Sequence, residues 1–303
     1  MERSERMQVF MDLTRVKPGK KICLKDLETG WAQNEEATFL GKGEMKERAN
    51  KLLEANRAEL AKAQELLYAS HTWAILIILQ GMDASGKDST IKHVLSGVNP
   101  QGCRVTSFKQ PSSNELDHDF MWRQVVALPE KGMIGIFNRS YYEEVLIVKV
   151  HQNLLEKQNL PTENFDKDFW ENRYQDISSY ERYLSRNGTL ILKFFLNISK
   201  DEQRKRFLER LNSPEKHWKF TDSDLKERDY WDKYIQAYED MLPCTSTKWA
   251  PWFVIPADYK WMARALVADI ITTSIYQLNI KYPEVDQNKR EAIQAAKKRL
   301  ESE

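Results

Sequence analysis

The chain has 303 residues, a formal net charge of +1, 41% hydrophobic residues and three cysteines. Its length allows one large domain or two small ones, and its balanced charge argues against a general nucleic-acid binder, which would carry a broad basic excess. The cysteines are far apart, which argues against a disulfide framework and a zinc site. The N-terminus has no signal-peptide core, and no apolar run could cross a bilayer, so we expect a soluble cytoplasmic protein that binds no membrane.

The chain then alternates between two kinds of pattern. Residues 1–42 have little periodicity, and residues 44–69 place apolar side chains at helical spacing. Strand-like runs follow at 72–80, 104–108, 132–137, 189–196 and 252–256. Helical patterns lie between and after them, at 86–96, 114–127, 141–155, 168–186, 200–211, 223–241, 258–280 and 288–303. Strands that alternate with helices predict an α/β fold with a five-stranded parallel sheet.

A glycine pattern follows the first strand-like run. The sequence GMDASGKDS, residues 81–89, comes directly after a nearly continuous apolar run and opens a helical pattern. Glycines permit a backbone that aims N–H groups at an anion, and the helix N-terminus adds partial positive charge. The sequence therefore predicts a phosphate-binding loop formed by Gly81, Ala84, Ser85, Gly86, Lys87, Asp88 and Ser89.

Two aspartates make this loop unusual. Asp88 stands where the common pattern has a Ser or Thr whose hydroxyl binds Mg²⁺, and Asp83 lies inside the loop. Carboxylates in an anion site cost Coulomb energy unless a cation is present, and Mg²⁺ prefers oxygen ligands and phosphates. We expect Asp83 to bind the metal, directly or through water, or else to orient the acceptor phosphate. Asp88 is a first-turn residue that suits the helix N-terminus.

Polar residues also follow the third strand-like run. Asn138 and Arg139 come at its carboxyl end, where open parallel sheets bind ligands. Arg139 can hold a phosphate through two parallel hydrogen bonds. Asn138 is neutral where many phosphate-loop enzymes have an acid, which shifts the expected metal role toward Asp83. Glu143 and Glu144 follow on the next helix. We expect one of them to face the site; the alternative is that both lie on a solvated helix face.

Two further segments supply charged candidates. Residues 200–222 read as a basic helix and its extension, in which Arg204, Arg206 and Arg210 would close over phosphates as a lid. An ordinary solvated helix is the alternative there. Residues 107–123 contain the acceptor-side candidates Lys109, Asp117, Asp119 and Arg123. A metal site at residues 117–119 is disfavoured, because neighbouring residues on a helix diverge around its axis.

Five strings together resemble the second polyphosphate kinase family. They are LQGMDASGKDSTIKHVLSGVNPQG, SFKQPSSNELDHDFMWR, FNRSYYEEVL, SPEKHWKF and TSTKWAPWFVIPADYKW, in the order of the family, between about residues 45 and 280. The resemblance implies a thymidylate-kinase-like phosphate-loop fold, a three-layer sandwich with a helical lid at about 200–222. It leaves residues 1–44 as an N-terminal extension and residues 281–303 as a polar C-terminal helix, either of which could serve assembly into a dimer or tetramer.

The resemblance also implies a reaction. Members of the family transfer phosphate from inorganic polyphosphate to a nucleotide with Mg²⁺, and their loop reads Gly-x-Asp-x-x-Gly-Lys-Asp, as this one does. Carried over by motif, the catalytic residues are Asp83, Lys87, Arg139 and Arg206, with Asp83 as the metal ligand. The nucleotide would lie against Asp83, Asp117, Arg123, Asn138, Arg139 and Glu143. FNRSYYEEVL is similar to the AMP-accepting members, so we expect adenine nucleotides, both AMP and ADP, with guanine nucleotides left open.

Two alternatives remain open from the sequence alone. The chain could be an ATP-dependent nucleoside monophosphate kinase, or a module that binds polyanions or nucleotides without catalysis. The charge balance gives no reason to expect nucleic acid as a partner in any of these cases.

Overall fold

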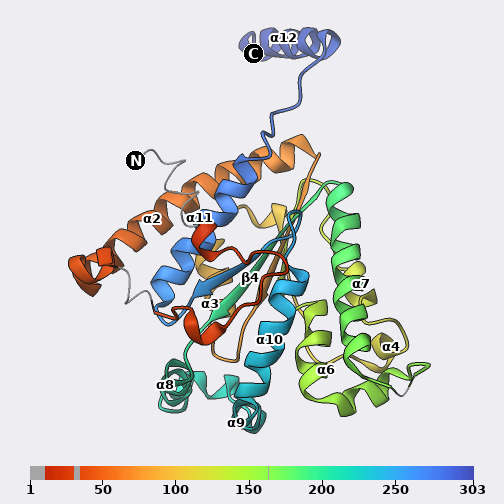
Figure 1. Ribbon diagram of the computed structural model, residues 1–303. Coiled ribbons are helices and arrows are strands. Elements are labelled where there is room, and N and C mark those ends of the chain that lie inside the picture. The colour runs from red at the N-terminus through yellow and green to blue at the C-terminus, as the bar shows by residue number, and fades with distance from the viewer. Residues whose placement is uncertain (1–10, 31–34, 163) are drawn as a thin grey trace.

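The protein is built on one parallel sheet. The computed structural model describes residues 11–30, 35–162 and 164–303 (Figure 1). Five strands, all parallel, lie in the order β2-β3-β1-β4-β5. They span Ala74–Gln80 (β1), Cys103–Ser107 (β2), Ile134–Asn138 (β3), Thr189–Asn197 (β4) and Trp252–Pro256 (β5). Each predicted strand is confirmed to within two residues, and so is the α/β fold with a five-stranded parallel sheet.

Helices cover both faces of the sheet, which confirms the three-layer arrangement (Figure 1). One layer consists of helices that contact each other, α2 (Glu35–Ser70), α3 (Lys87–Val94) and α11 (Lys260–Tyr276). The other layer is formed by α6 (Ile147–Val150), α7 (Lys167–Arg186) and α10 (Trp231–Thr245). Because both faces are covered, β1 and β4 are almost completely buried and most of their residues are apolar, as their sequences predicted.

The remaining elements are short or lie at the margins. Three-residue and longer 3-10 helices are η1 (Leu24–Asp26), η2 (Pro100–Gly102), η3 (Tyr141–Val145), η4 (Gln152–Gln158) and η5 (Pro214–Lys219). The other α-helices are α4 (Ser113–Leu116), α5 (Trp122–Val125), α8 (Lys200–Leu211), α9 (Asp222–Asp229) and α12 (Gln287–Glu301). Helix α12 stands away from the body of the molecule, and all of its residues are exposed (Figure 1).

Three predicted helices are divided into shorter elements. The helix expected at 114–127 is two single turns, because a capping box at Ser112 starts the first and the Asp119 carboxylate accepts from the Met121 N–H in the turn between them. The region 141–155 consists of η3, α6 and part of η4, and the hydroxyls of Tyr141 and Tyr142 are held by one buried carboxylate. The helix at 223–241 is divided at Tyr230 into α9 and α10.

The N-terminal part is more integrated than the sequence indicated. Helix α2 begins at Glu35, ahead of the predicted start at residue 44, and Gly41 interrupts its helical backbone with a φ of 74°. Met11, Val16 and Leu24 are buried in the core, and Arg15 forms an antiparallel bridge with Phe253 at the edge of β5. Residues 11–30 therefore cover one edge of the sheet, while 1–10 and 31–34 of the predicted extension lie outside the described residues.

The described residues include no helix that is both long and apolar enough to span a bilayer.

Candidate active site

The predicted phosphate loop lies between β1 and α3. Gly86 takes a φ of +101° at the N-terminus of α3, a conformation that favours glycine. Gly81 leaves no room for a side chain, since a Cβ there would lie 2.9 Å from the Leu196 carbonyl oxygen. Ala84 has a φ of +61°, which is strained for a residue with a Cβ. The loop thus has positive φ angles at Gly81 and Gly86, as its glycines permit, and a further one at Ala84.

Lys87 lies over the loop. Its Nζ donates to the carbonyl oxygens of Gly81 at 2.7 Å and Met82 at 3.3 Å. Burial, together with the weaker effect of the Arg139 guanidinium, lowers the pKa of Lys87 to about 8 against the opposing effect of nearby carboxylates. This ammonium is therefore poorly solvated and close to a second cation, an environment that favours the approach of an anion.

The ends of β1 and β3 bring the two halves of the site together. Their parallel register pairs Leu79 with Asn138, so Asp83 and Arg139 emerge at the same edge of the sheet. Arg139 donates to the Asp83 carboxylate at 2.9 Å and to the Glu143 carboxylate at 3.0 Å. Arg139 also has a φ of +66°. The structure thus joins three predicted site residues, Asp83, Arg139 and Glu143, in one charged cluster.

The second aspartate has a different partner. Asp88 accepts from Nδ2 of Asn138 at 2.6 Å, and that amide also lies 3.5 Å from the Ser107 hydroxyl at the end of β2. Oδ1 of Asn138 is buried and has no hydrogen-bond partner. Asp88 therefore connects the first turn of α3 to the end of β3, while Asp83 connects the loop to Arg139.

These oxygen atoms fit a magnesium ion that phosphates help to hold. Mg²⁺ is normally bound through one or two carboxylates together with substrate phosphates. Asp83, Asp88 and the buried Oδ1 of Asn138 supply hard oxygen donors at one edge of the sheet. The described residues contain no cluster of three or more His, Cys, Asp or Glu side chains that would enclose a metal alone. Substrate oxygens would have to complete the coordination.

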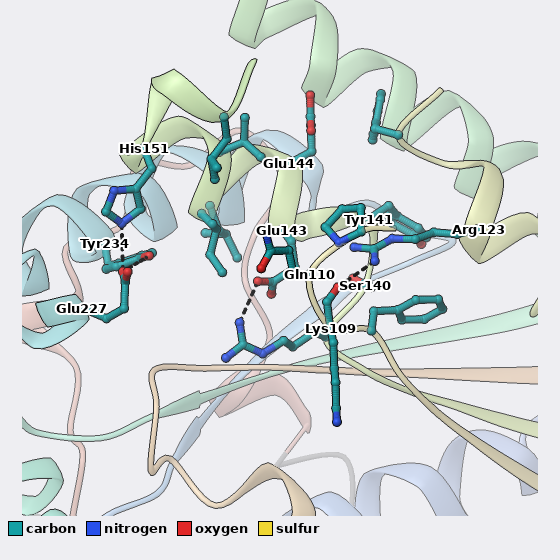
Figure 2. A pocket seen from close by; sticks show the side chains of 18 of the residues that line it. Lys109, Gln110, Arg123, Ser140, Tyr141, Glu143, Glu144, His151, Glu227 and Tyr234 are labelled. Atoms are coloured by element: carbon teal, nitrogen blue, oxygen red, sulfur yellow. Dashed lines mark hydrogen bonds and ion pairs between the residues drawn. The ribbon is translucent and has the colours of Figure 1, made fainter. Parts of the chain in front are cut away.

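A cavity of about 690 Å³ opens beside this cluster. Among the predicted residues, those that line it are Gly81, Asp83, Lys109, Arg123, Arg139, Glu143 and Glu144. Figure 2 labels Lys109, Arg123, Glu143 and Glu144 among them. The Arg123 guanidinium donates to the Lys109 carbonyl oxygen at 2.7 Å and lies over the Phe108 ring. Burial lowers the pKa of Arg123. The cavity has the size typical of a small-molecule site and combines apolar walls with several charged groups.

One predicted acceptor residue needs correction. Asp117 is exposed and does not line the cavity, whereas the candidate Asp119 and its neighbour His118 do. The reason is that Asp117 caps the end of α4, in the turn that separates α4 from α5. Glu144 is buried, lines the cavity and accepts from Gln158 at 2.8 Å, so it faces the site without belonging to the Arg139 cluster.

The lid arginines also differ from the prediction. Arg206 is buried, and its Nε and two amino groups donate to Glu202 and to the carbonyl oxygens of Ala84, Ser85, Ala257 and Asp258 at 2.6–3.0 Å. All five N–H donors of the guanidinium have partners, so Arg206 anchors the loop from behind and has none left for a phosphate. Arg210 pairs with Asp224 at 3.1 Å. Arg204 is exposed.

Sequence reasoning missed the far end of the cavity. His151 Nε2 lies 2.9 Å from the Glu227 carboxylate, which also accepts from the Tyr234 hydroxyl at 2.6 Å. These three side chains form one end of the cavity, apart from Arg123 and Tyr141 (Figure 2). Tyr238, one helical turn beyond Tyr234 on α10, also lines it. The four-residue tyrosine spacing was a signal for a helix face, but nothing in the sequence directed that face to this cavity.

A group of cations lies behind the loop. Arg264, from α11, donates to the Ser89 hydroxyl at 2.6 Å, so Ser89 faces this group. Burial lowers the pKa of Arg264, and the nearby charges of Arg57 and Arg206 lower it further. Lys260 has its pKa lowered by burial and then by Arg206. Mutual repulsion of this kind is relieved when an anion binds. Arg57, Lys260 and Arg264 were not among the residues predicted from the sequence.

Comparison with known proteins agrees with this geometry. The model of the polyphosphate kinase 2 family matches residues 43–283. The chain belongs to this family. It is 52% identical over 258 residues to an ADP-polyphosphate phosphotransferase of Rhodopseudomonas palustris, covering 85% of this chain and 89% of the relative. It is 47% identical over 239 residues to an AMP/ADP-polyphosphate phosphotransferase of Meiothermus ruber, covering 79% of this chain and 85% of the relative.

A solved structure shares the fold over almost the whole length. The polyphosphate kinase 2 of Arthrobacter aurescens superposes with a TM-score of 0.81 at 37% identity, covering 95% of this chain and 96% of that chain. The polyphosphate kinase 2 fold predicted from the five sequence strings is confirmed.

The anchoring position of Arg206 gives a testable prediction. Arg206→Ala should lower the free energy of unfolding by about 3–5 kcal/mol, because it leaves Glu202 and buried loop carbonyls without donors. Chemical denaturation measures this change. Arg204→Ala, at an exposed position of the same helix, should stay within about 0.5 kcal/mol of wild type. An Arg206→Ala variant of wild-type stability would contradict the anchoring position.

Proposed function

We propose that this protein transfers phosphoryl groups reversibly between inorganic polyphosphate and adenine nucleotides, with Mg²⁺ as its metal. The main supporting observation is that Asp83, in the phosphate loop of this polyphosphate kinase 2 family member, forms one cluster with Arg139 and Glu143. All three residues line a cavity of about 690 Å³. The relatives named above are polyphosphate phosphotransferases, and this chain matches each of them over most of its length. This geometry and these names support one reaction.

The nucleotide would occupy the cavity. Apolar groups such as Phe108, Phe120 and Leu154 line it together with the charged residues near the loop, as a base and a phosphate require. Arg123, Lys109 and Arg139 supply positive charge for the acceptor phosphate. The relatives that accept ADP, or AMP and ADP, support both nucleotides as acceptors here.

Polyphosphate would bind on the other side, across the loop and the cations behind it. It is a repeating anion without bases, so it needs a row of cations and no shaped pocket. Arg57, Lys260 and Arg264 lie at close range behind Ser89. Occupation by phosphates would relieve the repulsion among them. This divides the site into a donor side on α2 and α11 and an acceptor side at the cavity.

In the proposed reaction, an oxygen of the acceptor phosphate attacks the terminal phosphorus of polyphosphate in line with the bridging oxygen. A new P–O bond forms, the anhydride bond breaks, and polyphosphate leaves one unit shorter. Lys87, the loop N–H groups and Arg139 hold the transferred group and neutralise its charge. Asp83 and Asp88 would hold Mg²⁺, which supplies charge neutralisation on the phosphate oxygens. The acceptor is already anionic at neutral pH, so no general base is needed.

Cytoplasmic location and a dimeric or tetrameric state complete the proposal. The exposed helix α12, which stands off the body, supports assembly between copies of the chain.

The acceptor assay tests the function. ATP and ADP formation from ADP and AMP with polyphosphate and Mg²⁺ should be observed, and Lys87→Ala should reduce turnover by about 100- to 1000-fold, since it removes a charge at the transferred phosphate. Circular dichroism checks that the variant is folded. Transfer from ATP but none from polyphosphate would indicate a nucleoside monophosphate kinase. Binding of polyphosphate without any product would indicate a binding module.

The pKa of Lys87 gives a pH prediction. Because this pKa is lowered to about 8, mainly by burial, the ammonium is charged below that pH and loses its charge above it. The value of kcat/KM for polyphosphate reports the free enzyme, so it should fall with a single titration near pH 8. An ordinary lysine would titrate near 10.4. Lys87→Arg should move the falling limb to higher pH, and a profile that is flat up to pH 10 in the wild type would contradict the assignment.

A further inference from the structure

A lysine lies inside the central part of the sheet. Lys193, in β4, is fully buried, and the register places it between Ile78 of β1 and Trp252 of β5. Ile78 in turn pairs with Phe137 of β3, two residues before Arg139. A charged lysine is almost never fully buried unless it is paired, since removal from water costs several kcal/mol. The buried ammonium therefore needs partners that compensate for its lost hydration, and its presence in the core requires an explanation.

The partners form a closed network. Lys193 Nζ donates to Glu181 Oε2 at 2.6 Å, to the Tyr142 hydroxyl at 2.7 Å and to the Thr245 carbonyl oxygen at 2.7 Å, which uses all three of its protons. Oε1 of Glu181 accepts from the hydroxyls of Tyr141 at 2.9 Å and Tyr142 at 2.8 Å. The network joins β4, α7, α10 and η3, and the side chains of Lys193 and Glu181 are 0% exposed.

Both tyrosines belong to the segment that carries the site. Tyr141 and Tyr142 stand between Arg139 and Glu143, whose side chains are hydrogen-bonded to each other. The Tyr142 N–H donates to the Ser140 hydroxyl at 3.2 Å, so this residue is held at both its backbone and its ring. Arg139 has a positive φ, and such a conformation persists only when its surroundings hold it in place.

We propose that Lys193 and Glu181 are positioning residues for phosphoryl transfer: through the two tyrosine hydroxyls they set the path of residues 139–143 and so the placement of Arg139 and Glu143. The inference rests on the proposed function, in which Arg139 acts on the transferred phosphate. Neither Lys193 nor Glu181 lines the cavity, so their effect on the reaction passes through the backbone.

Stability alone is a weak reason for this pair. Replacing a buried ion pair by apolar residues of similar volume is often neutral or stabilising, whereas removing one partner leaves an unpaired charge and is strongly destabilising. Apolar side chains could therefore fill this position in the core. They could not hold two neighbouring tyrosine hydroxyls through one carboxylate. The directional part of the network is the part that reaches the site.

The double variant Glu181→Leu/Lys193→Met separates the two roles. It removes both charges together, so it should stay folded, while the tyrosines lose their common acceptor. Because a misplacement of about 1 Å can cost about 100-fold in rate, kcat on polyphosphate and ADP should fall by about 10- to 100-fold. KM for ADP should change less than kcat, since most of the residues that line the cavity lie outside residues 139–143. Tyr142→Phe should give a smaller loss of the same kind.

A matched control is the buried hydrogen bond between Asn56 and Asp269, which joins α2 to α11 at 3.0 Å and does not line the cavity. Asn56→Ala should lower stability and leave kcat per folded molecule unchanged. Wild-type kcat in the double variant, or a fall that only follows the folded fraction, would overturn the positioning role.

A second readout does not depend on turnover. Amide hydrogen exchange of residues 139–143 should be at least about 10-fold faster in the double variant and unchanged in Asn56→Ala. Unchanged exchange in the double variant would overturn the inference. Absence of wild-type turnover on polyphosphate would instead overturn the proposed function, and the exchange result would still decide whether the network positions this segment.

Discussion

The site depends on one guanidinium held between two carboxylates. Arg139 contacts Asp83 of the phosphate loop and Glu143 of η3, and so joins two segments that are 56 residues apart in the chain. The contact is possible because β1 and β3 are parallel neighbours whose carboxyl ends meet at one edge. Asp83 keeps oxygen lone pairs beyond those that Arg139 uses, since a carboxylate can accept about four hydrogen bonds. It can therefore serve the arginine and a metal ion together.

Buried charges behind the site hold this arrangement in place. Arg206 binds the carbonyl oxygens at Ala84 and Ser85 and so supports the strained part of the loop. The Lys193 and Glu181 network supports the opposite segment. Both sets are almost completely dry, where a hydrogen bond is stronger and an unpaired group is costly. The less buried charges are then left for the substrates, with cations from α2 and α11 on one side of the loop and the cavity on the other.

The sequence predicted the parts of this structure that depend on local pattern. Strand-like runs located all five strands, and the glycine spacing located the loop, because both reflect short-range packing and backbone limits. It did not predict where 114–127 and 141–155 break, since those breaks come from side chains such as Asp119 and Tyr142 bonding elsewhere. Arg206 looked like a lid residue, because its charge was visible and its carbonyl partners, up to 122 residues away, were not. His151 and Glu227, from distant segments, carried no joint signal.

Metal binding tests the central claim, that Asp83 serves both Arg139 and the metal, most directly. Mn²⁺ can replace Mg²⁺ because both prefer oxygen ligands, and its binding can be followed by electron paramagnetic resonance. In the presence of AMP, Asp83→Asn should bind Mn²⁺ at least about 10-fold more weakly than the wild type, whereas Asp119→Asn, elsewhere on the cavity wall, should bind it as the wild type does. Equal affinity in Asp83→Asn and wild type would contradict the account.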